Sequence, residues 1–272
     1  MSDACRIRRT CRPTRRPHEG TGPAGAAPAA GQARRRIRFS AGTTSALVGL
    51  GHANGLTVHG LVSAAVMIAH ARVAAEGPGG AAGEVATEVA VPFMYPVDVR
   101  TRIDPPVAAL AGTNIFGTVG FTRSVGAATE PLVLAKALLD ELDESVRDGV
   151  VQQSQLHFTG PAEDAPPPAH MPAAQAPAVL AADTTMLTNW GRIPHLRTPG
   201  GLTVTDFRGA VLDQPLRPVT GADPAAPPAP TSTYIVTAFD GRLGVELATA
   251  HTGARADALV TALDTTIRQL TA

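Results

Sequence analysis

Apolar residues recur at helical spacing in four segments of the chain, and these segments have recognisable start or stop signals. Thr57 precedes the second segment as an N-cap, and Pro131 stands in the first turn of the third. Gly55 follows the first, where a left-handed residue commonly ends a helix. The predicted helices are Thr43–Ala53, Val58–Glu76, Leu132–Val146 and Ala254–Leu270.

Six further segments have the alternating or compact apolar pattern of strands. Pro92 and Pro96 lie in the first, and because proline has no backbone N–H we expect this strand at a sheet edge or bulged near its end. Gly191 breaks the third, and Asp240-Gly241 predicts a tight hairpin between the last two. The predicted strands are Val85–Val97, Ile115–Ser124, Thr184–Trp190, Leu202–Phe207, Thr233–Phe239 and Leu243–Ala250.

The order of these elements is two helices, strands, a helix, strands that end in a hairpin, and a last helix. This order predicts an α/β sandwich in which one mixed sheet carries helices mainly on one face. Two Pro/Ala-rich stretches, residues 159–177 and 222–230, are predicted as loops.

Charged residues are unevenly distributed along the chain, although its formal net charge is zero. Residues 1–38 hold ten arginines against Asp3 and Glu19, and they lack apolar periodicity, so we predict a disordered leader over 1–38 and a folded domain over 39–272. The leader has two interpretations, a basic arm for nucleic acid or lipid and a non-native extension. The folded part is acidic, which argues against nucleic acid as a partner.

Cysteine usage and hydropathy limit the remaining classes. Cys5 and Cys11 both lie in the basic leader and form no ligand set with histidine, so no disulfide framework and no metal site are predicted. The N-terminus has no signal-peptide pattern, and no run reaches the roughly 18 apolar residues of a membrane span. We therefore expect a cytoplasmic protein without a transmembrane segment.

Common catalytic motifs are absent from the sequence: it has no GxSxG, P-loop, GxGxxG or HExxH string, and none of the eight histidines is adjacent to another. Chemistry-bearing residues gather instead at three places. The strand end VPFMYPVDVR (91–100) is followed by the turn TNIFG (113–117), the segment TNWGRIP spans residues 188–194, and the terminal hairpin and helix close the chain.

These three segments, in their order and spacing, resemble the C-terminal half of acyltransferases of the chloramphenicol acetyltransferase and condensation-domain superfamily. The resemblance extends from about Phe39 to Ala272 and is greatest to the polyketide-associated acyltransferases, which include phthiocerol/phthiodiolone dimycocerosyl transferase. It implies a CoA-dependent acyltransferase-like half and O-acyl transfer in lipid or polyketide ester synthesis. The implied donor is an acyl thioester on CoA or on the phosphopantetheine of a carrier protein, with no tightly bound cofactor, and the acceptor is a small molecule or lipid alcohol.

The resemblance also assigns roles to individual residues. Asn114 and Asn189-Trp190-Gly191 are expected to bind substrate along a tunnel, and Asp98 and Arg100 to form a structural salt link near it. The family's catalytic histidine belongs to an HHxxxDG motif in an N-terminal half. That motif does not occur in these 272 residues, so no catalytic residue is assigned, and we expect the chain alone to be inactive without a separate N-terminal half.

Two other hypotheses stay open at this point. The alternative to an acyltransferase half is a non-catalytic binding or interaction module that retains the fold, and a third option is an unrelated enzyme that uses His52, His59 or His195 as a base. The alternative role for Trp190 is that of an ordinary core residue. The alternative role for Asp98 and Arg100 is that of a purely architectural salt link. A half-domain would also expose the apolar face that its other half covers, which predicts self-association.

Overall fold

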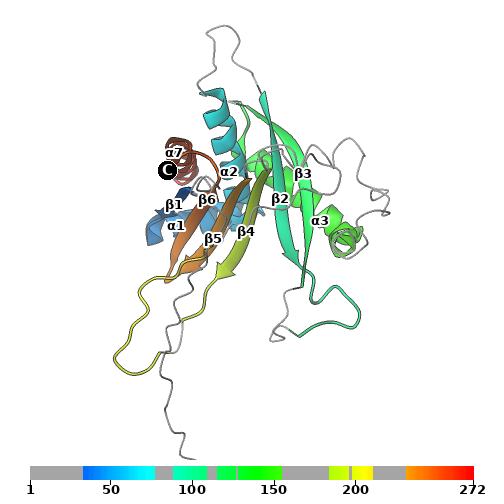
Figure 1. Ribbon diagram of the computed structural model, residues 1–272, viewed down its shortest axis with the longest axis vertical. Coiled ribbons are helices and arrows are strands. Elements are labelled where there is room, and N and C mark those ends of the chain that lie inside the picture. Colours follow the sequence, from blue (N-terminus) through cyan, green and yellow to red (C-terminus); the bar gives the residue numbers. More distant parts are fainter. Residues whose placement is uncertain are drawn as a thin grey trace, which may run out of the picture. The chain divides into compact units, whose positions relative to one another are not determined.

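The computed structural model describes residues 33–76, 88–108, 115–126, 128–154, 184–195, 198–210 and 231–272 of the chain. Six strands in these ranges form one mixed sheet in the order β1-β6-β5-β4-β2-β3 (Figure 1). The pairs β4–β5 and β2–β4 are parallel, and the other three pairs are antiparallel. The strands are β1 Ala33–Arg38, β2 Glu88–Asp98, β3 Phe116–Gly126, β4 Thr184–Arg192, β5 Thr231–Phe239 and β6 Arg242–Thr249.

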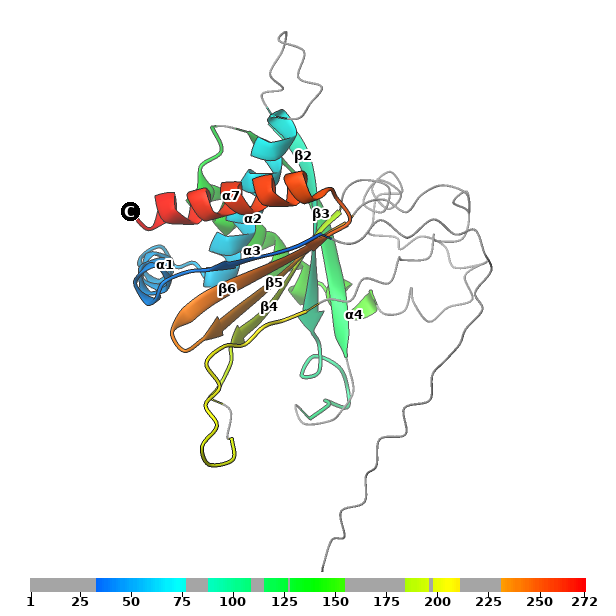
Figure 2. The ribbon, with the colours of Figure 1, turned by 60° about the vertical axis from the view of Figure 1, so that its left-hand side comes forward.

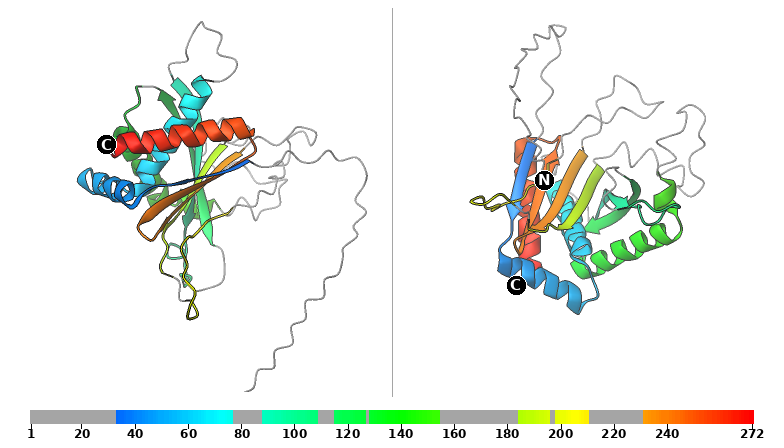
Figure 3. Two further views of the ribbon diagram at one scale, coloured as in Figure 1. Left: turned by 90° about the vertical axis from the view of Figure 1, so that its left-hand side faces the viewer. Right: turned by 90° about the horizontal axis from the view of Figure 1, so that it is seen from below.

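The long helices in the described part of the chain pack on the same face of this sheet. Arg35 on β1 bonds to Asp257 on α7, and Arg123 on β3 bonds to Glu141 on α3. Helix α2 crosses α7 on this face, as Figure 2 shows, and Figure 3 shows α7 (red) packed along the strands. The predicted one-sided α/β sandwich is therefore confirmed. The helices are α1 Ala41–Ala53, α2 Val58–Ala75, α3 Pro131–Arg147, α4 Val150–Gln153 and α7 Gly253–Leu270.

Local sequence signals set where these helices begin and end. The side chains of Ser40, Thr57 and Thr252 each accept a hydrogen bond from the backbone N–H three residues further on, which satisfies a donor that a helix start leaves free. Pro131 occupies the first turn of α3, and Gly55 after α1 has φ +64°. The predicted helix signals at Gly55, Thr57 and Pro131 are thus confirmed.

The terminal hairpin follows from two residues with positive φ. Asp240 has φ 51° and Gly241 has φ 68°, the combination of a two-residue turn whose twist matches that of the flanking strands. Strand β5 then pairs with β6 from Ser232↔Thr249 to Phe239↔Arg242. The hairpin predicted from Asp240-Gly241 is confirmed.

Helix α2 lies at the centre of the core, and 13 of its 18 residues are buried. By length and composition alone it would suffice to cross a membrane, but 72% of its apolar window is buried inside the fold. Gly60 brings α3 close, because a Cβ at this position would lie 2.7 Å from Cδ1 of Leu139. We therefore assign α2 to the hydrophobic core that joins the sheet to α3 and α7.

Strand β1 corrects the predicted leader boundary. Residues 33–38 were assigned to the disordered leader, but all six pair with β6, from Ala33↔Thr249 to Arg38↔Gly244. The arginine-rich composition concealed a period-two pattern: Ile37 faces the helices and is buried, whereas Arg36 faces the opposite side and forms an ion pair with Glu246. Residues 1–32 lie outside the described residues, so the leader there stays a prediction.

Strand β2 was predicted to lie at an edge or to be bulged near its end, but it lies inside the sheet and pairs with β3 without a register shift, so both alternatives are wrong. It pairs with β3 over all eleven residues, but with β4 only at Phe93↔Thr185 and Met94↔Met186. Pro92 and Pro96 lie two residues before and two residues after Met94. Backbone groups two residues apart in a strand point to the same side, so the nitrogens of both prolines point towards the same neighbouring strand as the nitrogen of Met94. Since the ladder with β3 is complete and the one with β4 is short, we infer that the two missing N–H groups face β4.

Two smaller expectations on the strands also changed. Residues 202–207 form no strand, because side chains and not a backbone ladder hold this segment to the sheet, as shown below. Gly191 was expected to break its strand, yet β4 continues to Arg192 through a register shift. The two predicted Pro/Ala-rich loops, residues 159–177 and 222–230, lie outside the described residues.

Candidate functional site

The end of β2 carries the predicted Asp98–Arg100 pair. The backbone N–H of Arg100 donates to Oδ1 of Asp98 at 3.0 Å, and its Nη1 donates to Oδ2 at 2.8 Å. The pKa of Asp98 lies below its usual range, mainly because of this backbone hydrogen bond and to a lesser extent because of the guanidinium. Asp98 is 62% exposed, whereas Val99 between the partners is buried. The pair therefore fastens the turn that leaves β2 at the surface.

The end of β4 carries the predicted Asn189-Trp190-Gly191 segment. Gly191 has φ +67°, and Oδ1 of Asn189 accepts a hydrogen bond from its N–H at 2.8 Å. The ladder with β5 shifts here, since Asn189 pairs with Val236 but Arg192 pairs with Ala238. The local sequence thus builds a bulge, which turns the Trp190 side chain outward and leaves it 46% exposed.

The two predicted segments end on neighbouring parallel strands. The ladder between β2 and β4 consists of two residue pairs, and beyond Met94↔Met186 the strands diverge towards their C-terminal ends (Figure 1). In the described residues no ladder pair joins 95–98 of β2 to 187–192 of β4. Carboxyl ends of diverging parallel strands are a common place for ligands in α/β sheets. Asn114, the other predicted substrate residue, lies outside the described residues.

The two faces of the sheet differ beside this divergence. On the helix face, Phe93, Tyr95 and Leu187 are at most 1% exposed and belong to the core. On the outer face, Met94 and Met186 are neighbours in the register, are half-buried and lie outside that core. Only the outer face therefore offers side chains to a ligand at this point.

A cluster that the sequence analysis missed holds residues 206–208 to the outer face. Nη1 and Nη2 of Arg36 donate to the two carboxylate oxygens of Asp206 at 2.5 and 2.7 Å, and Nε of Arg36 lies 2.7 Å from Glu246. Arg208 adds a contact to Asp206 at 3.2 Å. The alternation Arg34, Arg36, Arg38 was the available signal, but these residues were assigned to the leader.

The two carboxylates bonded to Arg36 have opposite pKa shifts, and the two shifts have different causes. The pKa of Asp206 lies far below its usual range, mainly because Arg36 donates hydrogen bonds to its carboxylate. Burial raises the pKa of Glu246, and attraction by Arg36 only partly offsets it. Asp206 is thus the firmly ionised anchor of the cluster.

Four histidines bear on the alternative of an unrelated enzyme. Nε2 of His70 lies 3.0 Å from the hydroxyl of Tyr234 in the core, and burial lowers the pKa of His59 to about 4 against the ring of Tyr95. His52 and His195 are exposed. Among the described residues, no three histidine, cysteine or acidic side chains come together as a metal site. His70, which is buried, and His59, which is half-buried beside Tyr95, thus serve packing.

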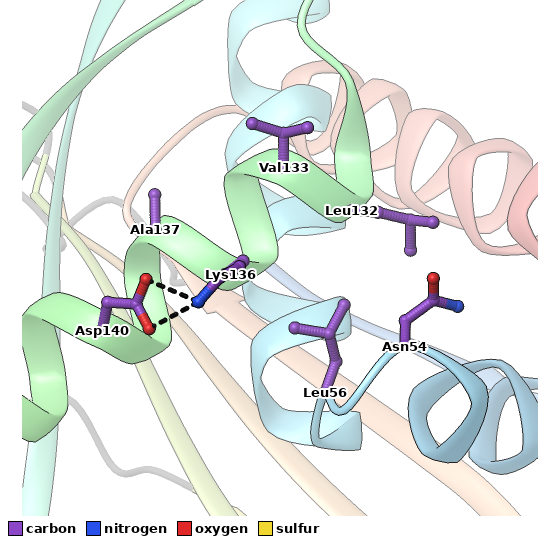
Figure 4. Close-up of a pocket in the computed structure, with 7 residues that line it drawn as sticks. All are labelled: Asn54, Leu56, Leu132, Val133, Lys136, Ala137 and Asp140. Carbon is purple, nitrogen blue, oxygen red and sulfur yellow. Dashed lines mark hydrogen bonds and ion pairs between the residues drawn. The ribbon is translucent and has the colours of Figure 1, made fainter.

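A separate cleft of about 410 Å³ lies where the turn between α1 and α2 meets α3 (Figure 4). Its polar groups are already engaged: Nζ of Lys136 contacts both carboxylate oxygens of Asp140, and Nδ2 of Asn54 donates to the carbonyl of Leu50. The remaining lining is apolar and belongs to the helix layer, with Leu56 and Leu132 among it. This cleft contains none of the residues predicted for the site.

A family model described as "Phthiocerol/phthiodiolone dimycocerosyl transferase C-terminus" matches residues 28–248. The chain is 33% identical over 174 residues to phthiocerol/phthiodiolone dimycocerosyl transferase of Mycobacterium leprae (strain TN), and 31% identical to that of Mycobacterium tuberculosis (strain ATCC 25618 / H37Rv). Each alignment covers 64% of this chain and 36% of the relative. The chain thus spans about a third of the length of the curated relatives it matches.

Solved structures show the same fold. Polyketide synthase associated protein 5 from Mycobacterium tuberculosis superposes with a TM-score of 0.59 and 25% identity, over 93% of this chain and 56% of that one. TRI3 trichothecene 15-O-acetyltransferase from Fusarium sporotrichioides superposes with a TM-score of 0.51 and 15% identity, over 89% of this chain and 47% of that one. These matches confirm the resemblance drawn from the three sequence segments.

Proposed function

The chain belongs to the phthiocerol/phthiodiolone dimycocerosyl transferase C-terminus family, and from this we propose that it is the substrate-binding C-terminal part of an O-acyltransferase. The reaction is transfer of an acyl group from a CoA or carrier-protein thioester to an alcohol, as in synthesis of lipid or polyketide esters. The observation that supports this proposal most is the short ladder of two residue pairs between β2 and β4. The segments that resemble the family lie on the strand ends beyond this ladder.

The divergence of these strands suits a thioester donor. Beyond Met94 and Met186 the facing backbone groups of β2 and β4 have no ladder partner in the other strand. A phosphopantetheine arm is extended and carries two amides, so backbone N–H and C=O groups recognise it as they recognise an added strand, although Pro96 can contribute only its C=O. In this proposal Asp98 with Arg100, and Asn189 with Gly191, hold the two strand ends in place, and Asn114 keeps its predicted role in substrate binding.

The chemistry requires a base, and this proposal places it on an N-terminal half. A histidine of an HHxxxDG motif on an N-terminal half removes the proton from the acceptor hydroxyl, whose oxygen then attacks the thioester carbonyl. The C–S bond breaks, the ester forms, and the thiol leaves with a proton. The proposed partners are therefore an N-terminal half, an acyl carrier protein or CoA, and a lipid or small alcohol, in the cytoplasm.

Complementation tests this proposal. Purified chain is incubated with lauroyl-CoA and a long-chain alcohol, alone and after co-expression with the N-terminal part of the Mycobacterium leprae relative. We expect no ester from the chain alone and ester formation from the pair. A substantial rate from the chain alone that His59→Gln abolishes would contradict the proposal, and thioester binding without transfer by the pair would identify a non-catalytic binding module.

A further inference from the structure

The outer face is apolar where the ladder between β2 and β4 ends. Met94 and Met186 stand next to each other at the last paired position, and Trp190 follows on the same strand face four residues beyond Met186. Thr188 is the only polar side chain that separates Met186 from Trp190 on this face. Methionine adapts its shape to irregular apolar partners, and tryptophan supplies a large rigid surface. Such a surface matches an apolar chain and not a charged group.

Phe207 supports the indole of Trp190 from the segment that crosses the outer face. The two rings meet edge to face, with centroids 6.1 Å apart and planes at 67°, and Phe207 also contacts Phe239 of β5 at 6.3 Å. Two residues further on, Gly209 lies against Ile235, where an added Cβ would come within 2.5 Å of Cγ2. The segment therefore lies flat on β5 and brings Phe207 to the edge of Trp190.

Asp206 holds this segment in place. Nη1 and Nη2 of Arg36 each donate one hydrogen bond to Asp206, and Nη2 also donates to the carbonyl of Phe207 at 3.2 Å. One guanidinium thus fixes the side chain of residue 206 and the backbone of residue 207 together, while its Nε is 2.7 Å from Glu246. With no backbone ladder in residues 202–210, these side-chain bonds determine where Phe207 lies.

We propose that Met186, Trp190 and Phe207 form the binding surface for the donor's acyl chain on the outer face of the sheet, and that Asp206 is a positioning residue that holds Phe207 against Trp190. The helix face is closed to such a chain because Phe93, Tyr95 and Leu187 already fill it. This inference rests on the proposed acyl transfer, since the thioester brings the acyl chain to the strand ends.

Fluorescence tests the binding surface directly, because Trp190 is the only tryptophan in the chain. The full chain is titrated with lauroyl-CoA, with acetyl-CoA and with CoA. We expect a saturable change of emission with lauroyl-CoA, at least about tenfold weaker binding of acetyl-CoA, and about tenfold weaker lauroyl-CoA binding in Met186→Ala. Equal responses to lauroyl-CoA and CoA, or no response to either, would overturn the assignment.

Asp206→Asn and Asp206→Glu test the positioning role. In Asp206→Asn we expect Trp190 to become more accessible to acrylamide and lauroyl-CoA to bind at least about fivefold more weakly, with partial rescue in Asp206→Glu. Asp257→Asn is the matched control, since Asp257 pairs with the neighbouring Arg35 but holds α7. If folded Asp206→Asn matched wild type, or if Asp257→Asn changed Trp190 equally, the positioning role would be wrong.

The outcomes separate this inference from the function it rests on. Ester formation by the complemented protein without any Trp190 response would leave acyl transfer standing and refute the outer-face surface. A chain-length-dependent Trp190 response without ester formation would support the surface and refute the transferase. The acrylamide measurement needs no ligand, so it tests the link from Asp206 to Trp190 in either case.

Discussion

Oδ1 of Asn189 accepts a hydrogen bond from the backbone N–H of Gly191 across 2.8 Å. This bond closes a turn of the Asx type inside strand β4, and Trp190 projects from its centre. Removing the acceptor leaves the Gly191 N–H to water and loosens the bulge without affecting the core. We expect Asn189→Ala to lower the free energy of unfolding by about 1 kcal/mol, measured by urea denaturation, and to broaden the Trp190 emission.

Asn189→Asp is the matched variant, because a carboxylate oxygen accepts the same hydrogen bond. It should retain the emission of wild type. If Asn189→Ala and Asn189→Asp were equally destabilised, the hydrogen bond would not be what sets the bulge, and the positive φ of Gly191 alone would have to do so.

Two glycines at strand ends should respond very differently to alanine. A Cβ on Gly117 would lie 1.9 Å from the carbonyl oxygen of Val151 on α4, so β3 and α4 would have to separate. Nothing lies within 4 Å of a Cβ on Gly191, whose cost comes from its φ of +67° alone. We expect Gly117→Ala to cost more than about 3 kcal/mol and Gly191→Ala about 1 kcal/mol in urea denaturation.

The comparison carries its own control, since both variants add one methyl group near a strand end. Similar losses would mean that α4 does not pack on β3 as closely as the structure shows. Shortening Val151 should not restore Gly117→Ala, because it removes only Cγ1, 2.7 Å from the added Cβ, and leaves the backbone carbonyl oxygen at 1.9 Å.

Sequence periodicity predicted the helices and the hairpin well because their signals are local. Thr57 and Asp240-Gly241 act through bonds and dihedral angles within four residues, so no knowledge of distant contacts is needed. The interior place of β2 depends on β4, about ninety residues away, and the prolines that argued for an edge instead limit that contact to two pairs. Sheet order is a tertiary property, and local pattern cannot supply it.

The candidate site divides in the same way. The Asp98–Arg100 bond spans two residues and was predicted, whereas the Arg36–Asp206 bond spans 170 residues and was not. Composition also misled, because four arginines in β1 resembled the charged leader although Ile37 and Phe39 beside them are buried. A period-two check inside charged segments would have found this strand.

His59 should make the fold sensitive to acid. Burial lowers its pKa to about 4, against 6.5 for the unperturbed side chain, so the folded state binds the proton less well than the unfolded state does. Stability should therefore fall as pH drops from about 6.5 to about 4 and change no further below that through this group. The difference of about 2.5 between the two pKa values limits the loss in the free energy of unfolding to about 3 kcal/mol. Thermal unfolding of His59→Gln should show a shallower loss over this range.

His52→Gln provides the control for that measurement, because His52 is exposed on α1 and should leave the acid dependence as it is. A curve for His59→Gln that runs parallel to that of wild type between pH 4 and 6.5 would assign the acid sensitivity to other groups. Asp206, whose pKa is lowered, affects stability at lower pH than His59 does. Its contribution to the free energy of unfolding is complete above about pH 4 and is lost only as the pH falls further.

Two exposed apolar side chains, on β4 and on the segment that follows it, should make the isolated chain self-associate. Trp190 is 46% exposed and Leu202 is 65% exposed, the latter at the turn closed by a bond from Oγ1 of Thr198 to its carbonyl. If an N-terminal half covers these side chains in the working enzyme, two copies of the chain alone should cover each other there. Light scattering should give a mass above that of one chain that falls for Leu202→Lys. Val133→Lys on α3, where Val133 is 67% exposed, should not change it, and a wild-type chain that stays monomeric at high concentration would refute the prediction.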